Sequence, residues 1–233
     1  MWRVLSEACR VSATVQDRQS RQAGHMAGSF KKILDAMEGA ELFGLFKKRR
    51  PSVVVVTLNA RLQPLDRAAL EDAFEAAMKQ CGHEIRIVGG GTQMAANGEI
   101  TECDIEIEID GPFEVTVNAV SETLATMLAP KGSTLYVSDQ DRRIDFGAHE
   151  GLALYLNGAD LPDDVYRDYD SNHVYAECGR LLEGLGIVSS HWQGPHETAL
   201  YMYGWDFTAM QERLTPFLQE YPLCQQCRVI QIA

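Results

Sequence analysis

Residues 89–110 read GGGTQMAANGEITECDIEIEID, and this stretch decides the fold that the sequence predicts. The Asn-Gly pair at 97–98 favours a type I′ β-turn, in which both central residues take a positive φ. The arm after the turn alternates strictly between isoleucine and acidic residues. Strand geometry therefore directs Ile105, Ile107 and Ile109 to a buried face and the intervening carboxylates to solvent. The stretch predicts an antiparallel β-hairpin with one buried face and one solvent-exposed face.

The hairpin lies within a β-α-β-β-α-β order that we predict for residues 52–138. Hydrophobic periodicity and turn residues predict these elements: a strand at 53–58, a helix at 65–80, a strand from 85 into the hairpin, a helix at 121–128 and a strand at 134–137. The same order recurs after a polar stretch at 139–145: a strand at 152–156, a helix at 174–185, hairpin strands at 187–192 and 198–203, a helix at 207–219 and a strand at 228–232.

The two halves also share local sequence. TLNARLQP at 57–64 resembles YLNGADLP at 155–162, with the Leu-Asn pairs 98 residues apart. An internal repeat of this kind indicates one supersecondary unit that is used twice. We therefore predict an α+β protein of two tandem ferredoxin-like βαββαβ repeats with antiparallel sheets, at 52–138 and 149–233. The pattern leaves open whether the two sheets pack separately or join edge to edge.

Helices cover only one face of a ferredoxin-like sheet, so each repeat should leave its other face bare. The bare face of the first repeat would carry Asp104, Glu106 and Glu108, and that of the second would carry Tyr201 and Tyr203. Carboxylates and tyrosine rings suit lysine and arginine through ion pairs and cation–π contacts. We interpret these five residues as a surface for a basic protein partner, against the simpler interpretation of a solvated face.

Charge is distributed unevenly along the 233 residues, whose formal net charge is −12. Residues 1–50 hold ten Lys/Arg and five Asp/Glu, while residues 51–233 hold eleven Lys/Arg and twenty-eight Asp/Glu. A body this acidic argues against nucleic acid as a partner, since phosphate binding needs clustered cations. The sequence shows no apolar run of about 20 residues, no signal-peptide pattern and no dense set of cysteines, which favours the cytoplasm.

The first fifth of the chain differs from the acidic body. Residues 1–25 have no consistent period, which predicts a disordered tail over residues 1–28. The alternative is a start codon assigned too early, with Met26 as the true first residue. Residues 29–51 form a basic amphipathic segment, in which Phe30, Ile33 and Leu34 recur at helical spacing before KKRRP at 47–51. We expect this segment to dock on the acidic body, with binding of residues 29–50 to a membrane surface as the alternative.

A second interpretation is a small-molecule-binding protein, or an enzyme, with its site in the cleft between the repeats. The lining would come from the two hairpins: Gly89, Gly90, Gly91, Thr92, His191 and His196. Exposed N–H groups of such a glycine segment can bind an anion, although glycines in a strand more often mark a bulge or a close backbone approach. The histidines fit neither an HExxH motif nor a triad. We therefore predict no catalytic residues.

Cys224 and Cys227 form a lone CxxC pair. A zinc site would need two further ligands, for which Cys81 and His83 are the candidates. The pair precedes a predicted strand, whereas a redox CxxC begins a helix, so we interpret both cysteines as structural thiols. We accordingly predict no metal and no cofactor.

Four segments resemble a group of bacterial cytosolic proteins of unknown function: LNARLQP at 58–64, the hairpin at 89–109, EGLALYL at 150–156 and residues 221–233. The resemblance covers about residues 52–233, implies a small bacterial cytosolic protein, and supplies no catalytic residues. Acidic α+β proteins of this size include immunity proteins that neutralise toxins, which is a likeness of class only. We therefore expect a non-catalytic cytoplasmic protein of the binding or inhibitor type, of which immunity proteins are one example.

Overall fold

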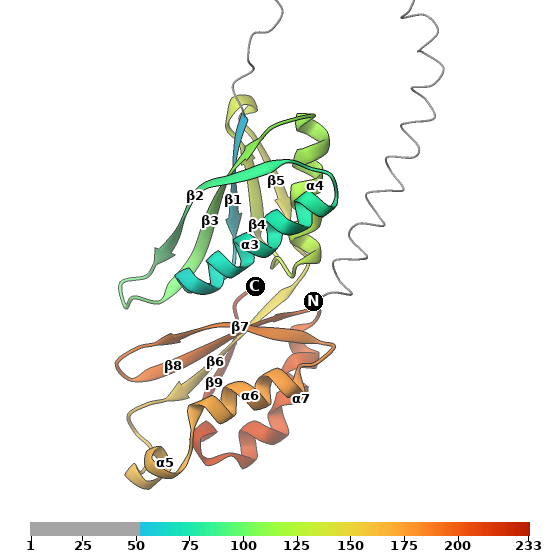
Figure 1. The fold of residues 1–233 in the computed structure, drawn as a ribbon. Helices are drawn as coiled ribbons and strands as arrows, with labels where there is room; N and C mark the ends of the chain where they lie inside the picture. Colours follow the sequence, from blue (N-terminus) through green and yellow to red (C-terminus); the bar gives the residue numbers. More distant parts are fainter. Residues whose placement is uncertain (1–51) are drawn as a thin grey trace, which may run out of the picture.

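The computed structural model describes residues 52–233, so the predictions for residues 1–28 and 29–51 lie outside its described part. Figure 1 shows two repeats, one above the other. The first contains β1 (Ser52–Leu58), α3 (Pro64–Gln80), β2 (Ile85–Met94), β3 (Ile100–Ile109), α4 (Phe113–Thr126), β4 (Ser133–Val137), the short η1 (Ser138–Gln140) and β5 (Arg142–Phe146). The second contains β6 (Glu150–Asn157), α5 (Asp163–Asp168), α6 (Ser171–Leu181), β7 (Gly186–Gln193), β8 (Glu197–Gly204), α7 (Phe207–Glu220), η2 (Pro222–Cys224) and β9 (Arg228–Gln231).

Both repeats have the predicted ferredoxin-like topology. The strand order is β2-β3-β1-β4-β5 in the first sheet and β7-β8-β6-β9 in the second, and the pairings within both are antiparallel. The two sheets are separate rather than joined at an edge. The predicted duplication of one chain path is confirmed, and β5 is an addition to the first copy.

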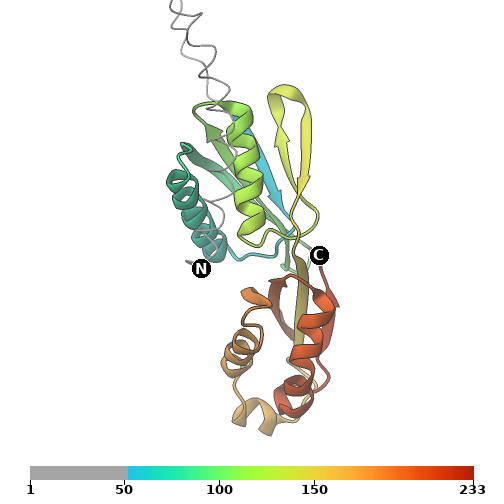
Figure 2. The ribbon, with the colours of Figure 1, turned by 90° about the vertical axis from the view of Figure 1, so that its right-hand side faces the viewer.

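The helices of each repeat lie on one face of its sheet. Figure 2 shows α3 and α4 side by side against the first sheet. Ile105, Ile107 and Ile109 face these helices, as predicted, and none is more than 4% exposed. They share one core with Phe74 and Val120 of the helices. The second core is built in the same way, from residues that include Leu152, Leu154, Val174, Met202, Met210 and Leu214.

Two elements of the first repeat differ from the prediction. α4 begins at Phe113 rather than at Ser121. β-branched residues near its start lower helix propensity, but Val117 is fully buried against the sheet, and burial outweighs propensity. The polar stretch after β4 forms a strand, β5, because its Ile144 and Phe146 pack on the first core.

The hairpin between β2 and β3 has a different turn from the predicted type I′. Of Asn97 and Gly98, only Gly98 takes a positive φ, at 81°. The Gly98 N–H donates to Ala95 O at 2.9 Å, and the Ala95 N–H donates to Glu99 O at 2.8 Å. The result is a longer loop with glycine at its left-handed position. This loop places Glu99 at the end of the first sheet that meets the second repeat.

The linker from β5 to β6, residues 147–149, is hydrogen-bonded to the first repeat. The N–H groups of Ala148 and His149 both donate to Ala129 O, at 3.2 and 3.3 Å. Gly147 precedes them with a φ of 91° and lies directly against the Pro130 carbonyl. The connection is therefore a packed part of the junction between the repeats.

Candidate functional site

The second repeat does not leave its helix-free face bare. Tyr201 and Tyr203 point to that face, opposite Leu200 and Met202, as the strand alternation predicted. Tyr201 is 0% and Tyr203 2% exposed, because the end of the first repeat packs on them and they join its hydrophobic core. The expectation of a bare face is therefore wrong for this repeat, and both tyrosines leave the predicted partner-binding surface.

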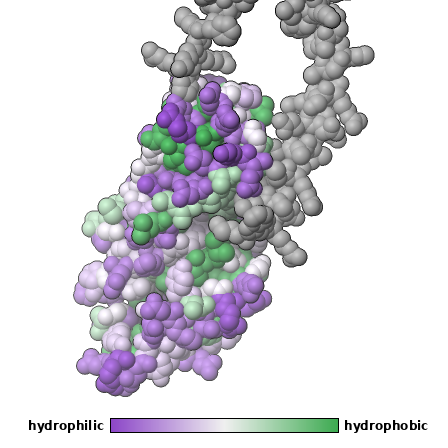
Figure 3. Space-filling model, in the orientation of Figure 1, coloured by the Kyte–Doolittle hydropathy of each residue, from purple (hydrophilic) through white to green (hydrophobic). Residues whose placement is uncertain are grey.

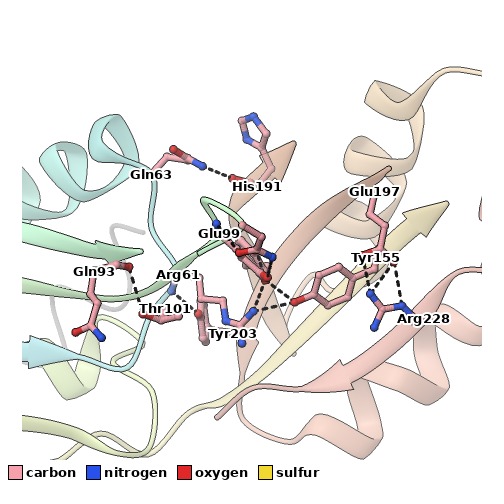
Figure 4. A network of polar contacts seen from close by, with 12 residues as sticks. Arg61, Gln63, Gln93, Glu99, Thr101, Tyr155, His191, Glu197, Tyr203 and Arg228 are labelled. Atoms are coloured by element: carbon pink, nitrogen blue, oxygen red, sulfur yellow. Dashed lines mark hydrogen bonds and ion pairs between the residues drawn. The ribbon is translucent and has the colours of Figure 1, made fainter. Parts of the chain in front are cut away.

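The covered tyrosines meet charged residues of the first repeat (Figure 4). Glu99, at the tip of the first hairpin, accepts a hydrogen bond from Tyr201 Oη at 2.7 Å and another from the Tyr155 hydroxyl. The same carboxylate oxygen forms an ion pair with Arg61. The Arg61 backbone N–H donates to Tyr203 Oη at 2.8 Å, and its guanidinium donates to Tyr155 Oη at 2.8 Å. One carboxylate, one guanidinium and three phenols thus join the repeats, and we call these five residues the junction network.

Further contacts flank the junction network. The Arg228 guanidinium lies over the Tyr155 ring, 4.5 Å from its centroid, and reaches both carboxylate oxygens of Glu197 at 2.7 Å. On the other side, Ser190 Oγ accepts a backbone N–H at the start of α3 and donates to Asp66 Oδ2 at 2.6 Å. The first turn of α3 is therefore hydrogen-bonded to β7, an edge strand of the second sheet.

Burial and pairing determine the protonation states in the junction network. Burial opposes ionisation of Glu99, but the two tyrosine hydrogen bonds and the adjacent guanidinium outweigh it and lower the pKa of its carboxyl. Burial, followed by the hydrogen bond to Glu99, raises the pKa of Tyr155 to about 12. The same two causes raise the pKa of Tyr201. At neutral pH the network is therefore an ion pair surrounded by neutral phenols.

This arrangement suits coupling of the two repeats better than catalysis. The shared oxygen of Glu99 already accepts from three donors. Phenols with raised pKa values are poor bases and nucleophiles at neutral pH. A buried polar network whose members satisfy one another rigidifies an interface and fixes its geometry. The tyrosines thus hold the second repeat against the first.

The acidic stripe of the first sheet lies on the helix-free face, and its three carboxylates differ in exposure. Glu106 is exposed, while Asp104 and Glu108 are half-buried. Glu108 forms an ion pair with Arg86 of β2. Within residues 52–233, neither Asp104 nor Glu106 has an ion-pair partner. Two of the three carboxylates of this stripe therefore carry charge that no described residue neutralises.

Apolar side chains lie directly beside the acidic stripe. In the antiparallel register, Val53 of β1 is opposite Glu108, and Val55 is opposite Glu106 on one side and Tyr136 of β4 on the other. Val53 is 38% and Tyr136 40% exposed. The helix-free face of the first sheet therefore combines a carboxylate row with an exposed apolar strip. We call the six residues Val53, Val55, Asp104, Glu106, Glu108 and Tyr136 the acidic face.

The residues of the alternative site are distributed over separate elements. Gly89, Gly90, Gly91 and Thr92 belong to β2 and pair with β3, while His191 lies on β7 and His196 in the turn after it. In the part of the chain that the structure describes, no hydrogen bond or ring contact joins the glycine segment to either histidine. A Cβ at position 89 would lie 2.8 Å from Glu106 Oε2. This glycine therefore makes room for a neighbouring side chain, as close approach in a strand requires.

The CxxC cysteines lie in the second core. Cys224 is 2% exposed, and burial raises its pKa to about 12 and also raises the pKa of Cys227. Such thiols are protonated at neutral pH and unreactive. Among residues 52–233, no group of three or more His, Cys, Asp or Glu is placed to hold a metal ion. None of the described helices combines the length and apolarity that a membrane span requires.

Sequence reasoning missed Arg61, Glu99 and Tyr155. Glu99 directly follows the Asn-Gly pair of the hairpin, and Arg61 lies in the Leu-Asn turn that the two repeats share. Both residues therefore lie in turns that the sequence predicts. Their partners are far away along the chain, however, and Arg61 and Tyr155 are 94 residues apart. No local pattern indicates contact across such a separation, so only the packing of the repeats reveals the network.

Comparison with known proteins adds no functional assignment. No family model matches the chain, and no curated protein matches it. Among solved structures, an unknown protein from Galdieria sulphuraria is 13% identical, over 78% of this chain and 96% of that one, with a TM-score of 0.24. The regulatory subunit of aspartate kinase from Thermus flavus is 12% identical, over 71% and 92%, with a TM-score of 0.26. The first two RRM domains of yeast poly(U) binding protein are 10% identical, over 77% and 99%, with a TM-score of 0.23.

Proposed function

We propose that this protein is a non-catalytic binding protein of the inhibitor type, whose acidic face binds a basic protein partner in the cytoplasm. The observation that carries the proposal is an asymmetry between the repeats. The helix-free face of the second sheet is covered by the first repeat, whereas that of the first sheet is exposed over the described chain.

The chemistry of the acidic face supports a partner rich in lysine and arginine. Asp104 and Glu106 offer carboxylates without an ion-pair partner among the described residues. Val55 lies opposite Glu106 in the register, and Val53 and Tyr136 are its neighbours on the same face. These apolar side chains can contact the aliphatic stems of long cationic side chains. The Tyr136 ring can also accept a cation–π contact. A basic partner would thus find charge and apolar area on one surface.

The charge of the whole body supports the same proposal. Residues 51–233 hold eleven Lys/Arg against twenty-eight Asp/Glu, a net charge of −17. A field of this sign and size accelerates the encounter with a basic protein and disfavours acidic ones. It also disfavours nucleic acid, whose phosphates would be repelled.

Reversing two charges of the acidic face should weaken binding of a basic probe about tenfold, because each exposed ion pair contributes up to about 1 kcal/mol and reversal replaces it by repulsion. The variant is Asp104→Lys with Glu106→Lys in the full chain. The probe is a fluorescein-labelled octapeptide that alternates arginine and valine, measured by fluorescence anisotropy at low salt. As a control peptide, an octapeptide that alternates glutamate and valine should bind neither the wild type nor the doubly substituted variant.

The matched control reverses two exposed charges elsewhere, as Glu212→Lys with Glu220→Lys on α7. This control changes the net charge by the same amount as the first variant. A similar loss of affinity for the basic octapeptide in both variants would show that only overall charge matters, and would contradict specific binding at the acidic face. A second control replaces Lys47, Lys48, Arg49 and Arg50 with glutamine. If this variant bound the probe more tightly than the wild type, and Asp104→Lys with Glu106→Lys removed that gain, the chain's own basic segment would be the occupant, which contradicts an external partner.

A further inference from the structure

A cavity of about 450 Å³ lies where the two repeats meet, beside the junction network and away from the acidic face. Its walls come from α3 and α4 of the first repeat and from β7 of the second. Figure 3 shows hydrophobic side chains at the level of this junction. The volume falls within the range of about 300–1,000 Å³ that is usual for small-molecule sites.

One stripe of α3 forms the first wall of the cavity. Asp66, Ala69, Leu70 and Ala73 all line it, at the i, i+3, i+4 and i+7 spacing of a single helical face. This stripe faces the junction between the repeats rather than the core, since Ala69 is exposed and Ala73 is half-buried, whereas Phe74 is buried in the core. Two of the four lining positions are alanine, and their small side chains leave the volume open.

The opposite walls are apolar and come from both repeats. Leu124 and Met127 at the end of α4 contribute one of them, and Ile187 and Val188 of β7 contribute the other. Ile187 is 50% exposed although it lies at the junction between two packed units. Apolar surface left open in a hollow of this kind is the surface that a ligand body covers on binding.

Two departures from regular backbone geometry occur along these walls. Leu128 takes a φ of 72°, at a helix end where glycine is the usual residue. β7 has a register shift between Val188 and Ser190, which leaves Ser189 as a bulge on the cavity wall. Strained non-glycine residues are enriched at functional sites, and β-bulges are enriched both at sheet edges, where β7 lies, and beside active sites. Both irregularities lie on the same cavity.

The polar end of the cavity is Asp66, the one charged residue among those that line it. Its Oδ2 accepts the Ser190 hydroxyl at 2.6 Å, while its other oxygen accepts no hydrogen bond from a described residue. Tyr203 also lines the cavity, but its hydroxyl already accepts the Arg61 N–H. We propose that the cavity binds a small apolar amine, whose hydrocarbon or aromatic body lies among α3, α4 and β7 and whose ammonium group pairs with Asp66.

Calorimetric titration of the full chain with 1-naphthylmethylamine and with 1-naphthoic acid tests the proposal, since the two probes share a ring system and differ in charge. The amine should bind at least tenfold more tightly than the acid. Asp66→Asn keeps an acceptor for Ser190 but removes the charge, so it should abolish this preference. Equal binding of the two probes to the wild type would overturn the proposal.

Filling the cavity provides an independent test. Ala69→Leu with Ala73→Leu should weaken binding of the amine at least tenfold. Ala68→Leu with Ala76→Leu changes two exposed alanines of the same helix that do not line the cavity, and should leave binding unchanged. Unchanged binding in the filled variant would place the amine elsewhere and overturn the assignment.

The chain's own amphipathic segment is the competing occupant. Changing Phe30, Ile33 and Leu34 together to serine would remove its apolar stripe from the full chain. If the amine bound only this variant and not the wild type, the segment would already occupy the cavity, and the proposal of a ligand site would be overturned. Similar binding to both proteins supports the ligand site.

Discussion

Glu99→Gln should lower the free energy of unfolding by about 2–3 kcal/mol at pH 7, because removing one partner of a largely buried ion pair leaves the other uncompensated. Glu99 is the shared acceptor for Arg61, Tyr155 and Tyr201. Glutamine keeps the shape of the side chain but lacks its charge. Urea unfolding followed by circular dichroism measures the change.

Glu177→Gln is the matched control for this substitution. Glu177 also pairs with an arginine, Arg180, but both lie on the surface of α6 three residues apart. An exposed pair of this kind contributes at most a few tenths of a kcal/mol. Equal effects of the two substitutions would show that the junction network contributes no more than a surface ion pair, and would contradict its role in coupling the repeats.

The effect of Glu99 should depend on pH in a defined direction. The pKa of Glu99 is lowered in the folded protein from an ordinary value of 4.5. Its contribution to stability is therefore fully present above pH 4.5 and is lost as the pH falls through the lowered pKa. The difference in stability between wild type and Glu99→Gln should be constant from pH 6 to 8 and shrink below about pH 4.5. A difference that instead grew in acid would contradict this assignment.

Gly147→Ala should lower the free energy of unfolding by about 3–4 kcal/mol, since it combines left-handed strain with a backbone clash. A Cβ at this position would lie 2.0 Å from Pro130 O, and φ is 91°. The nearest atoms to this Cβ all belong to the backbone of Ala129 and Pro130 rather than to a flexible side chain, so the linker itself must move. The expected consequence is loss of the hydrogen bonds from Ala148 and His149 to Ala129.

Gly184→Ala separates the two causes. Gly184 has a similar φ of 80°, but a Cβ there would meet no atom within 4 Å. This control should therefore cost only the left-handed strain, about 1–2 kcal/mol. If Gly147→Ala cost no more than the control, the linker would be free to move away from Pro130, and its packing would not contribute to the junction between the repeats.

Local patterns predicted most of the fold because each rests on short-range geometry. Alternation of isoleucine and acid in β3 determines which side chains share a face, whatever lies above that face. The last helix was predicted from residue 207 and begins there, where the Asp206 side chain accepts the Ala209 N–H. The start of α4 and the strand β5 were missed because long-range burial of Val117, Ile144 and Phe146 overrides weak local propensity.

The sequence alone determined that Tyr201 and Tyr203 point away from the helices of their own repeat, because the strand period allows only two directions. It did not determine what covers them. Only the tertiary structure decided that the first repeat packs on this face, and that Arg61 and Glu99 meet three phenols there. Contacts between residues about 100 positions apart depend on how whole units fit together, and no local periodicity carries that information.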